Sequence, residues 1–145
     1  MPRRCPQTRM AVALLILIVS ACTSGPPPSC GEDIGGVADP TTFDQYFGAM
    51  ALVNQTTGQP GPDGEQGSQF AQADPLVIQA DVRAAVELRA CVQPLSGGGE
   101  LAFDGTQTLG PGTGQVELGA FSPGTYVVRV IVGGTLVKNL PFEVQ

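Results

Sequence analysis

Apolar and polar residues alternate in short segments along most of the chain, and turn-forming residues separate these segments. From residue 42 onward, runs rich in valine, leucine and isoleucine give way every few residues to glycine, proline, asparagine or aspartate. This spacing is typical of a β-sandwich or barrel, because helical crossovers would need longer periodic stretches. The predicted strands are Phe47–Asn54, Gln69–Gln72, Leu76–Val82, Val86–Gln93, Glu100–Leu109, Gln115–Phe121, Tyr126–Val132 and Leu136–Val144.

The segment Val86–Gln93 shows the alternation clearly. Successive side chains of a strand point to opposite faces, so one set of positions faces the core and the other faces outward. The inward set is Val86, Leu88, Ala90 and Val92, and the outward set is Glu87, Arg89, Cys91 and Gln93. Cys91 is therefore expected outside the core, where a segment from the N-terminus can reach it.

The end of the chain predicts a hairpin. Gly133 and Gly134 separate Val127–Val132 from Leu136–Val144, and glycines supply the positive φ angles that a two-residue turn needs. Pro141 has no N–H to donate to a neighbouring strand, so we expect the last strand to lie at a sheet edge or to carry a bulge.

A turn with the sequence F-S-P-G-T-Y, residues 121–126, leads into this hairpin. It is similar to the E–F corner of immunoglobulin-like and fibronectin type III-like sandwiches, in which a tyrosine hydroxyl bonds back to upstream backbone. The stretch Leu118–Val144 resembles the closing three strands of bacterial Ig-like extracellular domains. The resemblance implies an all-β, Ig-like sandwich of about seven or eight antiparallel strands over residues 42–145. Two features depart from antibody domains, because the chain has no tryptophan and Cys30 lies too early for their inter-sheet disulfide.

Three aromatic residues precede the first long strand. Phe43, Tyr46 and Phe47 have the spacing of one face of a short helical turn. They either pack on the end of the sandwich or form a surface patch for a partner, and the packed arrangement is the favoured prediction.

The first 21 residues have the three parts of an export signal. Arg3, Arg4 and Arg9 form a basic head, an apolar run covers Met10–Val19, and small residues follow. The apolar run is shorter than the roughly 20 residues that a membrane-spanning helix needs, so a cleaved signal peptide is favoured over an uncleaved N-terminal anchor.

The residues Val-Ser-Ala-Cys at 19–22 resemble the lipobox of bacterial lipoproteins. The resemblance implies cleavage after Ala21 and acylation of Cys22, which would hold the protein on a lipid bilayer; a cysteine there by chance is the alternative. Residues 22–41 would then be a lipidated cysteine and a stalk, since Pro26–Pro28 favours an extended polyproline conformation. We therefore expect a domain in the bacterial cell envelope, outside the cytoplasm.

Cysteine usage agrees with export. Cys5 leaves with the signal and Cys22 carries lipid, so Cys30 and Cys91 remain in the mature chain. Two cysteines in an oxidising compartment predict one disulfide, and two free thiols are the alternative. No C-x-x-C spacing marks a redox site.

Charge and composition narrow the possible functions. After cleavage, four basic and thirteen acidic side chains leave a net charge of −9, which disfavours nucleic-acid binding. The absence of histidine removes the Ser-His and Cys-His pairs of nucleophilic catalysis, so we expect neither an enzyme nor a cofactor. Asp63 and Glu65 lie in a loop of three Gly-x-y triplets, residues 58–67, where a solvated turn is favoured over a calcium site.

Two functional classes remain. One is a non-catalytic binding or scaffolding module whose partner is an envelope protein or polysaccharide, and the other is an accessory subunit of an envelope transport or secretion system. The first is favoured because Ig-like sandwiches offer loops and strand edges to partners. The expected contact surfaces are the acidic loop at residues 55–68 and the last strand, the latter by strand addition.

Overall fold

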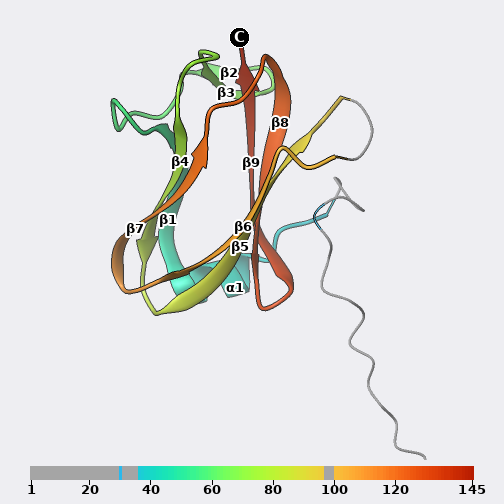
Figure 1. The fold of residues 1–145 in the computed structure, drawn as a ribbon. Coiled ribbons are helices and arrows are strands. Elements are labelled where there is room, and N and C mark those ends of the chain that lie inside the picture. The colour runs from blue at the N-terminus through green and yellow to red at the C-terminus, as the bar shows by residue number, and fades with distance from the viewer. Residues whose placement is uncertain (1–29, 31–35, 97–99) are drawn as a thin grey trace, which may run out of the picture.

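Two β-sheets pack face to face in the computed structural model, which describes residue 30, residues 36–96 and residues 100–145 (Figure 1). The three-stranded sheet has the order β1 (Phe47–Asn54), β4 (Leu76–Val82) and β7 (Gly112–Gly119). The six-stranded sheet has the order β2 (Asp63–Gly64), β3 (Gly67–Phe70), β9 (Thr135–Val144), β8 (Gly124–Val132), β5 (Val86–Pro94) and β6 (Phe103–Leu109). One helix, α1 (Pro40–Tyr46), precedes β1. The predicted all-β sandwich is confirmed, with the two-residue β2 as an additional strand.

The strands β1 and β4 have the predicted bounds, and β5, β8 and β9 differ from the prediction by one or two residues at an end. The prediction was wrong by more at three strands: β3 covers Gly67–Phe70 and not Gln69–Gln72, β6 begins at Phe103, and β7 begins at Gly112 and ends at Gly119. At β7 the glycines caused the error. Gly114 faces inward, where an added Cβ would lie 2.9 Å from Leu109 Cδ1, so this glycine meets a packing need within the strand.

The core lies between the sheets and contains the inward set predicted for β5. Leu88, Ala90 and Val92 are fully buried, and Val128 of the neighbouring β8 is equally buried. Hydrophobic burial of this kind is the main favourable term in folding.

An aromatic cluster closes one end of the core around Tyr126. Its ring stacks on Phe142 at 5.1 Å between centroids, and Phe121 lies 5.5 Å from Phe142. The Tyr126 hydroxyl donates a hydrogen bond of 2.8 Å to the carbonyl oxygen of Ser122. The tyrosine corner expected from the resemblance is therefore confirmed.

The hairpin of β8 and β9 turns at Gly133 and Gly134, whose φ angles are +56° and +80°. Both angles lie in the left-handed region that favours glycine, as the two-residue turn requires. Farther along the pair the register shifts, because Val130 lies opposite Lys138 while Ile131 lies opposite Leu136. The bulge predicted as one of two consequences of a proline in this strand is thus present, four residues before Pro141.

The other alternative, a free sheet edge, does not hold along the whole strand, because β9 lies between β3 and β8. Residues Ser68–Phe70 of β3 pair with Phe142–Val144 of β9 in parallel orientation. Near the start of β9, the N–H of Asp39 donates to the carbonyl oxygen of Leu136. The fold therefore includes one parallel strand pair. A partner strand cannot pair with the full length of β9, because both of its ends are already occupied on that side.

The aromatic residues before β1 take the predicted helical turn. Asp39 caps α1, since its carboxylate accepts hydrogen bonds from the backbone N–H groups of Thr41 and Thr42. Phe47 is fully buried, and Phe43 and Tyr46 pack against the core. The packed alternative is confirmed.

Candidate functional site

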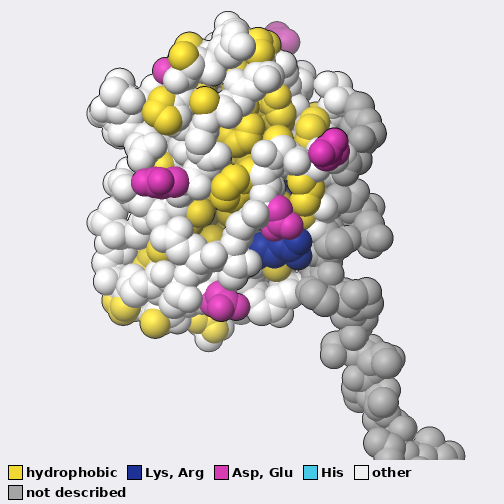
Figure 2. Space-filling view, in the orientation of Figure 1, with side chains coloured by type: hydrophobic (Ala, Val, Ile, Leu, Met, Phe, Trp, Pro, Cys, Tyr) yellow, Lys and Arg dark blue, Asp and Glu magenta, His cyan; other side chains and the backbone are white. Residues whose placement is uncertain are grey.

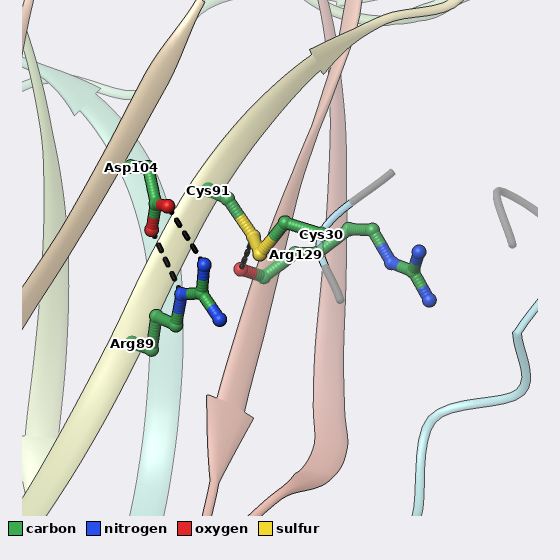
Figure 3. Close-up of polar contacts among 5 residues, drawn as sticks. All are labelled: Cys30, Arg89, Cys91, Asp104 and Arg129. Atoms are coloured by element: carbon green, nitrogen blue, oxygen red, sulfur yellow. Dashed lines mark hydrogen bonds and ion pairs between the residues drawn. A yellow bond between two sulfur atoms is a disulfide. The ribbon is translucent and has the colours of Figure 1, made fainter. Parts of the chain in front are cut away.

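A disulfide joins Cys30 to Cys91 on the outer face of the six-stranded sheet (Figure 3). The alternation along β5 places Cys91 opposite the inward set, as predicted, and the two Cα atoms lie 6.0 Å apart, an ordinary separation for a disulfide. Cys91 is fully buried although it faces away from the main core. The predicted pairing is therefore present, and its burial requires cover on the outer face.

A second, small hydrophobic cluster supplies part of this cover. Cys30, Cys91, Ile131 and Leu136 form it, and Ala38 and Leu101 pack against it. The cluster joins the segment before α1 to the middle of the sheet.

Arg129 lies beside the disulfide on this face. On β8 it pairs with Cys91 of β5 on one side and with Asn139 of β9 on the other. Its side chain is only 2% exposed, and its Nε and Nη1 atoms have no hydrogen-bond partner among the described residues. Burial of an unpaired charge is costly. Alternation in β8 predicts that Arg129 faces outward, but no pattern in the sequence signals that this outward position is buried.

Asn139 lies beside Arg129, and the nitrogen of its side-chain amide is hydrogen-bonded. Its Nδ2 donates to the carbonyl oxygen of Gly36 at 3.1 Å, while its Oδ1 has no partner in the part of the chain that the structure describes. The hydrogen bond holds the segment that leads into α1 against β9.

An ion pair flanks the disulfide on the other side. Arg89 donates two hydrogen bonds to Asp104, from Nε at 2.8 Å and from Nη2 at 2.7 Å (Figure 3). These bonds hold the pKa of the Asp104 carboxyl below its usual value and raise the pKa of Arg89. Because the side chains are 36% and 39% exposed, solvent screens the pair and its net contribution to stability is at most about 1 kcal/mol.

The two surfaces predicted for partner contact meet at one groove of about 360 Å³. Asp63 and Gly67 of the predicted acidic loop line one part of it, and Lys138 and Leu140 of the last strand line another. The loop is not a simple connection, because it contains β2 and the bridge between Val53 and Pro60. The sequence predicts each surface separately but not their proximity, which depends on the parallel pairing of β3 with β9.

The groove carries few charged groups. Lys138, the only lysine of the chain, places its Nζ 5.2 Å from the centroid of the Phe43 ring, in a cation–π contact. On the face of the molecule seen in Figure 2, acidic side chains are scattered singly and one cationic patch adjoins an acidic group.

Cys22 and the residues around it lie outside the described residues, as does the signal segment. Within residues 36–96 and 100–145 and at residue 30, no three histidine, cysteine, aspartate or glutamate side chains gather as metal ligands, around Asp63 and Glu65 or elsewhere. No helix in the same part of the chain has the length and apolar character to cross a bilayer.

Comparison with known proteins adds no family assignment. A scan against protein-family models finds no matching family, and a search of curated proteins finds no significant match.

Proposed function

We propose that the chain is an exported bacterial lipoprotein, acylated on Cys22, whose β-sandwich is a non-catalytic binding or scaffolding domain in the cell envelope. The disulfide between Cys30 and Cys91 is the observation that carries the proposal. Disulfides form and persist in oxidising compartments and are rare in the cytoplasm of most bacteria. The pairing therefore supports export, which the order of basic, apolar and small residues before Cys22 also favours.

Acylation would supply the membrane attachment by itself. Each buried methylene of an acyl chain contributes about 0.8 kcal/mol of membrane affinity, so two or three chains hold a soluble domain on a bilayer. The net charge of −9 after cleavage repels the domain from anionic lipid. A lipid anchor overcomes this repulsion without a basic surface on the domain.

The groove between β1 and β9 supports a binding role. It lies where an edge of the three-stranded sheet meets the β9 side of the other sheet, and Met50, Leu52 and Leu140 contribute apolar surface to it. Strand edges and loops are common contact surfaces in sandwich domains. A photo-crosslinking residue at Ser68, in this groove, should form adducts with an envelope partner, whereas the same residue at Thr108, on β6, should not. Equal adducts at both positions, or none at either, would remove the groove from the proposal.

Lipid labelling tests the anchor. Cells expressing the wild-type chain should incorporate labelled palmitate into the protein, and the protein should partition into detergent. Cys22→Ala should abolish both results. Cys5→Ala is the matched control, because Cys5 lies in the cleaved segment and its loss should leave labelling unchanged. Labelling that persists in Cys22→Ala, or wild-type protein in the aqueous phase, would contradict the proposal.

A further inference from the structure

We propose that β1 is the docking edge for an extended peptide segment of a partner protein, which pairs with it antiparallel and alternates apolar and basic side chains. The inference rests on the proposed binding role and deepens it, because it names the strand that pairs with the partner and the chemistry of the bound segment. It is carried by the free main chain of β1 and by hollows on both faces of that strand.

One side of β1 has no neighbouring strand along most of its length. Among the described residues β1 is the end strand of the three-stranded sheet, and β4 occupies its other side. The N–H of Gln55 donates to the carbonyl oxygen of Pro75, which directly precedes β4, whereas the N–H of Asn54 donates to Gln59 on the opposite side. Main-chain groups of a strand alternate in direction, so the N–H and C=O of Met50 also point away from β4. They face the groove, where a further strand can pair with them.

β1 also lacks the devices that protect free strand edges along most of its length. Native proteins place charged side chains, prolines or bulges at such edges, or keep the edge strands short. The other end strands of the described sheets follow this rule, since β2 has two residues, β6 carries Asp104 and β7 carries Glu117. In β1 the bulge is confined to the start, between Phe47 and Ala49. Residues 49–52 after it have the sequence A-M-A-L, with no charge and no proline, so they are open to a partner strand.

The opposite wall of the groove does not offer the same pairing at Pro141. This residue has no N–H, and its carbonyl oxygen lies against Gly67 of β3. The N–H of Gln145 donates to Phe70 of β3, and alternation directs the main chain of Pro141 toward the same side. A segment that enters the groove at this level therefore finds its hydrogen-bonding partner in β1.

Hollows on both faces of β1 have room for the side chains of an added strand. The groove of about 360 Å³ lies on the inner side. A second hollow of about 250 Å³ lies on the outer face, where Ala49 and Ala51 adjoin Gln79 of β4. Side chains of a strand alternate between faces, so those of the added strand enter the groove and the outer hollow in turn. A second copy of β1 would bring alanines to the outer hollow, which favours a segment with larger side chains.

The lining of the groove selects an apolar side chain. Met50, Leu52 and Leu140 contribute apolar surface, and the groove has one charged residue of each sign, Asp63 and Lys138. The Nζ of Lys138 already lies over the Phe43 ring. An apolar side chain buries the most surface here at no cost in unpaired charge.

The outer hollow selects a basic side chain. Its one charged lining residue is Asp81, which is exposed. Arg83 lies nearby, but its Nη1 donates to the carbonyl oxygen of Asp44, and the ion pair found among the described residues is the one between Arg89 and Asp104. A lysine of the bound segment can therefore pair with Asp81. The net charge of −9 after cleavage also attracts a basic segment.

A peptide titration followed by NMR tests the pairing. The protein is the isotope-labelled chain from residue 22 onward, with the disulfide formed and the Cys22 thiol alkylated, and the probe is the acetylated and amidated peptide V-K-V-K-V. We expect saturable shifts at the amides of Met50 and Leu52. At a peptide concentration of three times Kd, hydrogen exchange of the Met50 amide should slow about fourfold. No saturable shift at Met50 up to about 10 mM peptide, which would nearly fill a site with a Kd of about 1 mM, would overturn the proposal.

Methylated peptides test the direction of the hydrogen bonds. In an antiparallel pair, directly opposite residues have side chains on the same face, and alternate pairs exchange two N–H···O bonds. The residue opposite Met50 is then a valine, whose N–H bonds to the Met50 carbonyl oxygen. N-methylation of the valines should abolish binding, whereas N-methylation of the lysines, whose N–H groups point away from β1, should leave it intact. The opposite result, or equal effects, would overturn the antiparallel pairing.

Charge variants test the basic side chain. Asp81→Asn should weaken binding of V-K-V-K-V by about two- to fivefold, the effect of losing one exposed ion pair. Glu87→Gln on β5 is the matched control, because it removes the same charge from an exposed site on the other sheet and should leave Kd unchanged. Equal losses in both variants, or tighter binding of the peptide V-E-V-E-V by the wild type, would overturn the assigned chemistry.

Two comparisons separate this inference from its alternatives. Slowed exchange at Met50 without peptide, in step with a molar mass that rises toward that of a dimer, would overturn the peptide segment in favour of a second copy of the chain. Adducts in cells from the photo-crosslinker at Ser68, together with no peptide effect at Met50, would refute strand pairing and leave the groove as a binding surface. Peptide pairing at Met50 with no adducts in cells would uphold the docking edge and refute the proposed envelope partner.

Discussion

Removal of the Cys30–Cys91 disulfide should destabilise the domain by about 4 kcal/mol. The two cysteines are 61 residues apart, and opening a loop of that size restores this amount of chain entropy to the unfolded state at 25 °C. A domain of ordinary stability has about 5–15 kcal/mol in total, so the loss is a large part of it. The change in packing is small by comparison, because the cluster that holds Cys30 has four buried members among the described residues.

Urea unfolding of the chain from residue 22 onward measures this loss. With a slope of about 1–2 kcal/mol per molar urea, the midpoint of Cys30→Ala/Cys91→Ala should fall by about 2–4 M. Reduced wild-type protein is the control, since it keeps both sulfur atoms but opens the loop, and it should fall by the same amount. A loss below about 1 kcal/mol in both proteins would refute the entropic account. A loss confined to the alanine variant would assign the effect to packing.

Three further substitutions test separate parts of the structure. Tyr126→Phe should cost about 1 kcal/mol of unfolding free energy because it removes one partly buried hydrogen bond, whereas Tyr46→Phe, with no hydroxyl bond given by the described residues, should cost little; equal losses in urea would contradict the role of the corner. Leu88→Ala should cost about 2–5 kcal/mol and lower Tm by at least 8 °C, since the side chain is fully buried; a shift below 3 °C would place Leu88 outside the core. The pKa of Asp104 is lowered by the bonds from Arg89, so its contribution to stability is present above the ordinary aspartate pKa and is lost as pH falls through the lowered value. Carbon-detected NMR should find Asp104 titrating at lower pH than in Arg89→Met, and identical titrations would contradict the pairing.

Local patterns predicted most of the elements. The apolar alternation in β5 also predicted that Cys91 lies on the outer face, within reach of Cys30, because the period of a strand fixes which side chains share a face. The turn at Gly133 and Gly134 followed from the φ angles that only glycine adopts freely.

Long-range features were missed for physical reasons. Parallel pairing of β3 with β9 depends on contacts between segments about 70 residues apart, and a hydrophobic pattern does not specify which strands are neighbours. The predicted strand Gln115–Phe121 excludes Gly114, because a glycine that makes room for Leu109 looks the same in sequence as one that turns the chain. Burial of Arg129 arises from cover over the outer face, which the period of β8 does not encode.

One measurement tests the account most directly: mass spectrometry of peptides from the protein isolated from cell envelopes without reduction. The account predicts an N-terminal peptide that begins at Cys22 and carries acyl chains, together with a pair of peptides joined through Cys30 and Cys91. An N-terminal peptide that retains residues 1–21, or cysteines at 30 and 91 that alkylate without reduction, would contradict it.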